Sequence, residues 1–238
     1  IIVLGPRIGR FAPDGTPRLI AGHNLTLVTL GGFILWLAWF GFNAGSTLTS
    51  SGNLGKIMLN THLAGVSAVT AYLLISGVMR KAILLSDTVN ISLAGLVAIT
   101  AGCATMSPVY AIVTGVGACL AYLAVKRLLD NVQMDDAVYA VAVHVGGGVW
   151  GTLAAGLFYE GDLFSTHRII VQMMGIGAMF VWSFGLGMVV YFVIEKTIGL
   201  RVLAQHEQRG LDFTEHAEGA YPEFQDSLFS QQTLTERH

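Results

Sequence analysis

The chain has 238 residues, of which 53% are hydrophobic and only 12% are charged, and its formal net charge is −2. Soluble domains carry roughly 25% charged residues, so this composition excludes an ordinary soluble globular domain. We expect no nucleic-acid partner, and the lipid bilayer is the first environment to test.

Five stretches of the chain contain no Asp, Glu, Lys or Arg: 19–55, 57–79, 88–125, 137–159 and 169–194. A helix needs about 20 apolar residues to cross a bilayer, and each stretch is long enough. The longest one has room for two helices, because Pro108 in TMSPVY cannot continue a helix. The pattern predicts an all-α, polytopic helical membrane protein with six spans, near 24–45, 57–79, 88–105, 108–126, 137–158 and 169–194.

Polar segments flank these spans. Residues 1–23, with the turn sequences GPRIGR and PDGTP, are predicted to form a cytoplasmic loop. Residues 24–195 then form the membrane domain, and 196–238 form a polar cytoplasmic tail with one short amphipathic stretch. The chain begins without Met, in a segment like the end of an earlier helix, so we expect it to be an internal piece of a longer protein.

The basic residues predict the orientation in the membrane. Eleven of the 13 Lys and Arg lie in the first loop, in the loops after the second and fourth spans, and in the tail. The other side has only Lys56 and Arg168. Because cytoplasmic loops are enriched in Lys and Arg, we expect both ends to be cytoplasmic, in a multi-pass protein of the cell (inner) membrane.

The first span ends in an aromatic and polar cluster. Trp39, Phe42 and Ser46 are spaced three and four residues apart, so they share one helical stripe. One interpretation is an aromatic belt at the membrane interface. The other is a vestibule for a small cation, because aromatic faces attract cations and a hydroxyl adds an oxygen ligand. The predicted orientation places this stripe on the outer side.

His144 is an ionisable residue inside the fifth span, and such residues usually face a pathway or a partner. On a regular helix its face continues through Gly147, Gly148, Gly151 and Ala155. Small residues let a neighbouring backbone approach closely, so we expect this face to be buried in protein. The alternative is a histidine held by a single hydrogen bond between helices.

Other polar residues suggest structural roles. His62 lies near the outer end of its span, where an interfacial role is expected. A haem held by two histidines has no other support. Asp135 and Asp136 precede the His144 span, where the helix dipole favours carboxylates. Cys103 and Cys119 lie in predicted spans and are interpreted as small apolar residues. No metal-spaced Cys/His set, cofactor site or nucleophile–base pair is expected, so an enzyme is not predicted.

Four motifs occur in order along the chain: WFGFNAGS (39–46), LAGLVAITAGC (93–103), MDDAVYAVAVHVGGGVWGTLAAGLF (134–158) and GLRVLAQHEQRGLDFTEHAEGAY (199–221). Together they resemble the Amt/Mep/Rh ammonium transporter family. The resemblance covers nearly the whole chain, but only the second half of the family's fold, helices six to eleven and the tail. It implies an inverted-repeat fold with the substrate path at the repeat interface, and a homotrimer with one pore per subunit.

The resemblance also assigns roles to residues. Trp39 and Phe42 match positions near the outer mouth, with Phe42 at the gate, and Ser46 matches the hydroxyl of the outer ammonium site. His144 matches the second of two paired pore histidines, whose partner belongs to an earlier helix outside this chain. The implied mechanism is capture of ammonium, loss of its proton because the charged form is costly to desolvate, and passage of ammonia down an apolar lumen.

The chain departs from the family pattern in three places. Tyr139 stands where an acidic residue is common, Val145 stands where Gly usually follows the pore histidine, and the tail continues beyond Tyr221. Some relatives are fused to signalling modules and act as ammonium sensors. Two functions therefore stay open, an ammonium transporter and the membrane sensor of a signalling protein. In either case the tail is where a PII-type regulator or a fused module would act.

Overall fold

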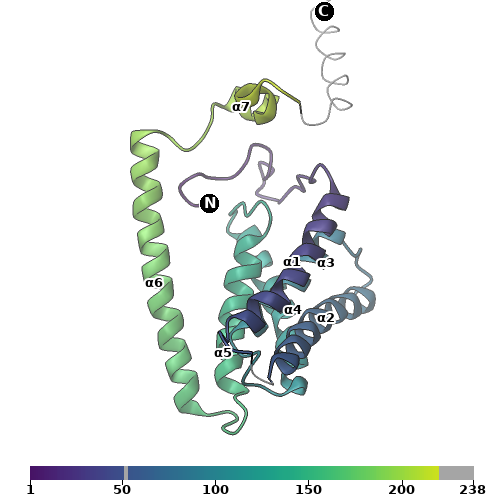
Figure 1. The fold of residues 1–238 in the computed structure, drawn as a ribbon. Helices are drawn as coiled ribbons and strands as arrows, with labels where there is room; N and C mark the ends of the chain where they lie inside the picture. The colour runs from purple at the N-terminus through teal and green to yellow at the C-terminus, as the bar shows by residue number, and fades with distance from the viewer. Residues whose placement is uncertain (51–52, 220–238) are drawn as a thin grey trace, which may run out of the picture.

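The computed structural model describes residues 1–50 and 53–219, and it is helical throughout its apolar part (Figure 1). No strand occurs among these residues, so the all-α prediction is confirmed. The elements are α1 (Leu25–Gly45), α2 (Leu54–Val78), α3 (Leu85–Thr100), α4 (Pro108–Asn131), the π-helical turn η1 (Ala142–Gly146), α5 (Gly147–Leu157), α6 (Thr166–Thr197), α7 (Ala204–Arg209) and α8 (Leu211–His216).

Each of the six predicted spans contains a helix. Within the described residues, α1, α2, α4 and α6 are long and apolar enough to cross a membrane. The other two are shorter: α3 has 16 residues, and the backbone is helical over 140–157 when η1 and α5 are taken together. The break before Pro108 is confirmed, since Pro108 begins α4.

Several of the predicted span bounds differ from the helices by three to five residues, and the largest differences are at the ends of the third and fourth spans. The span expected at 88–105 begins three residues earlier, at Leu85, and ends at Thr100. The span expected to stop at 126 continues to Asn131. The physical reason is that Lys126 donates to the carboxylate of Asp87, at 2.6 and 2.8 Å. Because these two charges pair, α3 can begin before Asp87 and α4 can continue beyond Lys126.

The helices form a bundle with one outlying member. Helix α2 packs against α3 and α4, α5 packs on the other side of α3 and α4, and α1 lies across α2 and α3. Helix α6 stands at the left of Figure 1 and, among the described elements, packs only on α5. None of its residues is buried. Helices α1 to α5 therefore form the core, and α6 presents a long apolar surface.

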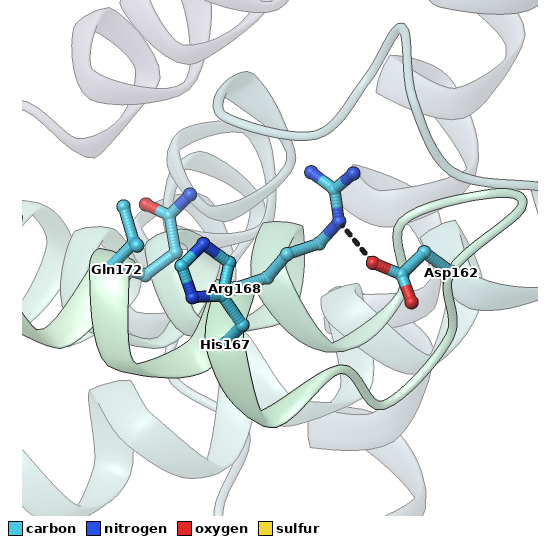
Figure 2. A pocket seen from close by; sticks show the side chains of 5 residues that line it. Asp162, His167, Arg168 and Gln172 are labelled. Atoms are coloured by element: carbon cyan, nitrogen blue, oxygen red, sulfur yellow. Dashed lines mark hydrogen bonds and ion pairs between the residues drawn. The ribbon is translucent and has the colours of Figure 1, made fainter.

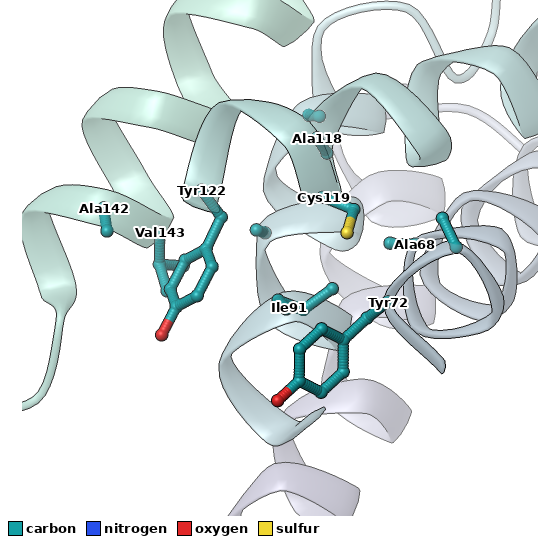
Figure 3. Close-up of a cluster of buried hydrophobic side chains, with 11 residues drawn as sticks. Ala68, Tyr72, Ile91, Ala118, Cys119, Tyr122, Ala142 and Val143 are labelled. Carbon is teal, nitrogen blue, oxygen red and sulfur yellow. The ribbon is translucent and has the colours of Figure 1, made fainter. Parts of the chain in front are cut away.

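Small residues line the centre of the bundle. Ala68 and Ala118 are fully buried in one cluster, together with the rings of Tyr72 and Tyr122 (Figure 3). Ala94 is fully buried in the same cluster. Lipid chains are as apolar as leucine, so helices associate in membranes through close packing of small residues rather than by escape from water. Gly151 illustrates this, because a Cβ built on it would overlap the carbonyl oxygen of Ala98 in α3.

Most of the basic residues gather at one end of the bundle, which we call the Arg-rich end. The guanidinium of Arg10 is buried and lies 2.5 Å from Asp130 and 3.3 Å from Asp135. Burial by itself raises the pKa of Asp135, but hydrogen bonds from Arg7 and the charges of Arg7 and Arg10 hold that pKa below its ordinary value. These ion pairs tie the first loop to the segment between α4 and η1.

The tail reaches the same end of the bundle. The backbone N–H of Ile8 donates to Glu207 of α7 at 2.8 Å, and Arg201 pairs with the same carboxylate. The expected amphipathic stretch is α7, after which Gly210 takes a positive φ of 102°. The first loop and the described part of the tail therefore lie at one end, as an even number of spans requires. The segment DSLFSQQTLTERH lies outside the described residues.

The opposite end of the bundle holds the other three connections. Lys56, at the start of α2, forms an ion pair with Glu160, and the N–H of Glu160 donates to the carbonyl of Thr105 at 2.7 Å. Arg168 of α6 pairs with Asp162 at 2.8 Å. Both basic residues at this end are thus neutralised by an acid of the α5–α6 loop.

The two ends of the bundle are expected to face opposite sides of the membrane. Single cysteines at Thr49 and at Gln208, both exposed, should react differently with an impermeant thiol reagent added to intact cells. The native cysteines, Cys103 and Cys119, are buried and provide a low background. Labelling from outside at Thr49 only is the expected result, and equal labelling at both positions would contradict the topology.

The contact between α5 and α3 is expected to tolerate no added side chain at Gly151. Gly151→Ala should destabilise the protein by about 1–3 kcal/mol, the usual cost of overpacking, because a Cβ there meets the backbone of Ala98. Gly148→Ala is the matched control, since its nearest neighbour would lie 3.9 Å away. Thermal unfolding in detergent compares the two variants. Equal stability would show that α3 and α5 can move apart at Gly151 without loss of stability.

Candidate functional site

The last two turns of α1 are held by hydrogen bonds to two neighbouring helices. The indole N–H of Trp39 donates to the hydroxyl of Thr100 in α3 at 3.0 Å. The amide of the buried Asn43 donates to the hydroxyl of Thr61 in α2 at 2.9 Å. A hydrogen bond between helices removes a polar group from contact with lipid, so these two bonds fix the rotation of α1 about its axis.

This rotation leaves the predicted stripe at the surface of the bundle. Phe42 is 58% exposed, and its ring centroid lies 5.9 Å from that of Trp39 with an edge-on interplanar angle of 70°. Ser46 is exposed, and its hydroxyl donates to the carbonyl of Phe42 at 2.6 Å. The structure therefore brings Trp39, Phe42 and Ser46 together. The Ser46 oxygen gives its proton to the helix, and its lone pairs stay available to a cation.

His144 lies within the π-helical turn η1, and its side chain is exposed. Within the described residues, His144 does not share the buried face of Gly147 and Gly151 that a regular helix predicts. A π turn adds one residue to the turn, which shifts the preceding residues by about 100° relative to a regular helix. Ala142 and Val143 consequently take the buried side, at 0% and 3% exposure, and His144 points away from it.

Most of the rest of the predicted glycine face is buried as expected, and only Gly148 is half-buried. Gly147, Gly151 and Ala155 are buried, and a Cβ on Gly147 would lie 2.9 Å from the carbonyl oxygen of Ala94 in α3. Helix α5 is therefore seated on α3 beyond the π turn. In the described part of the chain, His144 makes no hydrogen bond or ring contact with another side chain, so the alternative of a histidine satisfied by a helix–helix hydrogen bond finds no support within it.

Asp135 and Asp136 are both predicted to be first-turn acids, but in the structure they have different partners. Asp136 accepts hydrogen bonds from the N–H groups of Ala140 at 2.9 Å and Val141 at 2.6 Å, so that prediction is confirmed. Asp135 instead accepts from the backbone and side chain of Arg7, at 2.7–2.9 Å. The Asp135 carboxylate therefore binds the first loop rather than the helix end, because the guanidinium groups of Arg7 and Arg10 both pair with it.

His62 lies on the other flank of α1. Its exposed ring sits between Trp36, at a centroid distance of 5.7 Å, and Phe40, at 6.1 Å. Helix α2 and η1 do not contact each other among the described elements, so His62 and His144 are not brought together. The interfacial role expected for His62 stays a prediction, and a shared ligand between the two histidines does not fit this arrangement.

A separate pocket of about 260 Å³ opens at the end opposite to the Arg-rich end (Figure 2). It is lined by Asp162 and by residues of the first turns of α6, namely His167, Arg168, Val171 and Gln172. The Arg168 side chain forms its ion pair with Asp162 across the view and stacks on Tyr159. None of the predicted site residues lines this pocket.

Sequence reasoning missed the polar residues that position the site. Thr61, Thr100 and Asn60 lie in charge-free runs without an assigned role. Asn60 is fully buried and donates to the carbonyls of Cys103 and Met106, at 2.9 Å each, which fixes the turn after α3. The available signal was an uncharged polar side chain in a membrane helix, where it requires a partner.

Known proteins are similar to this chain in sequence. The model of the Ammonium Transporter Family matches residues 1–221. Ammonium transporter Amt2 of Archaeoglobus fulgidus is 38% identical over 240 residues, which cover 94% of this chain and 51% of that protein. The putative ammonium transporter sll0537 of Synechocystis is 42% identical over 222 residues, which cover 91% of this chain and 41% of that protein.

Solved structures share the fold. A structure named Sensor Amt Protein has a TM-score of 0.85 and 40% identity, and the match covers 90% of this chain and 55% of that chain. The crystal structure of Saccharomyces cerevisiae Mep2 has a TM-score of 0.75 at 22% identity, over 86% of this chain and 49% of that one. The chain thus spans about half the length of the relatives that it matches.

Proposed function

Because the chain belongs to the ammonium transporter family, which its match over residues 1–221 establishes, we propose that it forms half of an ammonium pathway across the cell membrane. The observation that carries the proposal is the set of chemical groups exposed on otherwise apolar helices. Phe42 and Ser46 on α1 and His144 on η1 face away from the core. A hydroxyl and an imidazole are costly in lipid, so these groups are expected to line a path completed by another segment.

The α1 stripe suits the capture of ammonium. The Trp39 and Phe42 rings offer faces to a cation, and the Ser46 oxygen offers lone pairs. Ammonium presents four N–H donors to these groups. Its charge makes entry into an apolar lumen costly, so the ammonium gives up its proton to a path that uses the histidine pair, and neutral ammonia passes. Phe42, whose side chain is exposed, stands at the entrance to that lumen.

His144 is proposed to line the lumen beyond the gate. A neutral imidazole has one donor and one acceptor nitrogen. It can therefore hydrogen-bond ammonia and release it again while the imidazole itself carries no charge. An exposed position in this half is what a residue at the interface of two repeats requires. A second histidine from the other half would complete the pair.

The assembly and setting follow from the same family. We propose a homotrimer in the cell (inner) membrane, with the Arg-rich end in the cytoplasm according to the distribution of Lys and Arg. Residues 1–23 then form a cytoplasmic loop, 24–195 the membrane domain, and 196–238 the cytoplasmic tail. Ammonium and ammonia are the proposed substrates, and a PII-type regulator or a fused module would bind at the cytoplasmic face.

A pair of histidine variants tests the pathway. In the complete protein, His144→Ala should lower ammonium conduction or change its selectivity, because it removes hydrogen bonds worth about 1–3 kcal/mol, which is roughly fivefold to a hundredfold in rate. His62→Ala is the control and should conduct normally, since His62 lies on the other flank of α1. Conduction is measured in proteoliposomes, alongside assembly. Equal conduction by both variants would remove His144 from the pathway.

A second candidate function, an ammonium sensor, has its own support. The chain is 40% identical to the structure named Sensor Amt Protein. In this chain Glu207 of the tail accepts a hydrogen bond from Ile8 of the first loop, and that bond and the Arg201 pair lower the pKa of Glu207. The contact is therefore fully present above the ordinary pKa of a glutamate and is lost as the pH falls through the lowered value. Such a contact could pass a change in the bundle to the tail.

Truncation after Tyr221 in the complete protein separates the two functions. A transporter should keep most of its flux, because the family match ends at that residue. A sensor should still bind ammonium and lose its downstream response, since a ligand transmits a signal only through states that it binds with different affinity. Ammonium binding, flux and the response are measured on one preparation. A response that survives the truncation would contradict a signalling role for residues 222–238.

A further inference from the structure

Asp136 holds the start of the helix that carries His144. The residue is 6% exposed. Its carboxylate accepts the N–H of Ala140 at 2.9 Å and the N–H of Val141 at 2.6 Å, with Ala142 more distant at 3.4 Å. Ala142 is the first residue of the π turn. The Asp136 carboxylate thus accepts hydrogen bonds from the N–H groups at the start of the helix, which otherwise have no intrahelical partner.

The backbone before this cap is strained. Tyr139 adopts a φ of 56°, in the left-handed region that side chains other than Gly rarely occupy. Its N–H donates to the carbonyl of Asp136 at 3.1 Å, and its own carbonyl accepts from Val143 at 2.9 Å. Such strain persists only where surrounding contacts fix the chain. Here the contacts on both sides of Tyr139 involve Asp136 and the π turn.

Beyond the π turn the helix cannot rotate to compensate. Gly147 and Gly151 rest against the backbone of α3, so the register of α5 is fixed there. Any change of register between residues 140 and 146 must therefore be absorbed by the turn that contains His144. With a regular α-helical turn, His144 would rotate by about 100° toward the face that Ala142 and Val143 now occupy.

We propose that Asp136 is a positioning residue for His144: its cap on Ala140–Ala142 maintains the π turn that turns the imidazole out of the core and toward the pathway. The inference deepens the proposed function and rests on it for the role of His144. The neighbouring Asp135 provides a contrast, because it has the same 6% exposure but binds Arg7 and Arg10 instead of the helix.

Structures of three variants of the complete protein, determined by electron cryomicroscopy in lipid nanodiscs, test the proposal. In Asp136→Ala the π turn should be lost and His144 should rotate into the core, while Val149 keeps its position. Asp136→Asn should keep the turn, because an asparagine oxygen caps a helix nearly as well as a carboxylate. Asp135→Asn should also keep it, since Asp135 makes no contact with the helix end.

Three results would overturn the proposal. The first is a retained π turn in Asp136→Ala, and the second is an equal loss of the turn in Asp135→Asn. The third is failure of Asp136→Ala to assemble while Asp135→Asn assembles, because a local change of register should not prevent assembly. The readout is the backbone itself and needs no transport, so normal conduction by His144→Ala would refute the proposed function without changing this result.

Discussion

Close contact between helix backbones is the constraint on which the rest of the structure depends. Gly151 and Gly115 leave no room for a Cβ against the backbone of the facing helix, and fully buried alanines fill the spaces between them. In a membrane this packing replaces the hydrophobic effect as the cause of association. With α2 to α5 locked in this way, the freedom that remains lies at the helix ends, and the candidate site is built there.

The site combines a fixed frame with exposed groups. Trp39 and Asn43 each bond to a neighbouring helix, and this anchoring allows Phe42 and Ser46, on the same turn, to stay exposed without loosening α1. On the other side of α3, the glycines of α5 fix its register and the π turn displaces His144. In both places a polar or aromatic group reaches the surface because the residues around it are held by the core.

Electrostatics are arranged differently at the two ends of the bundle. At the Arg-rich end, buried carboxylates and guanidinium groups join segments distant in sequence, as in the contacts of Asp135 with Arg7 and Arg10. At the opposite end the two basic residues pair with exposed acids of one loop. Exposed pairs contribute little to stability, whereas breaking a buried pair leaves an uncompensated charge. The first loop is therefore held by buried ion pairs, whereas the contacts of Glu207 in the tail are exposed.

The sequence by itself determined the six helical segments, the break at Pro108, the shared end of the first loop and tail, and the stripe of Trp39, Phe42 and Ser46. These features depend on the length of the charge-free runs and on the local spacing of residues, and both can be read directly from the sequence. Only the tertiary structure decided where His144 points. A regular period of 3.6 residues predicts a buried face, and the π turn, with the Asp136 cap before it and the Gly147 and Gly151 contacts after it, shifts that face by about one residue. The separation of Asp135 from Asp136 was likewise beyond the sequence, because Arg7 and Arg10 reach Asp135 across more than 120 positions of the chain.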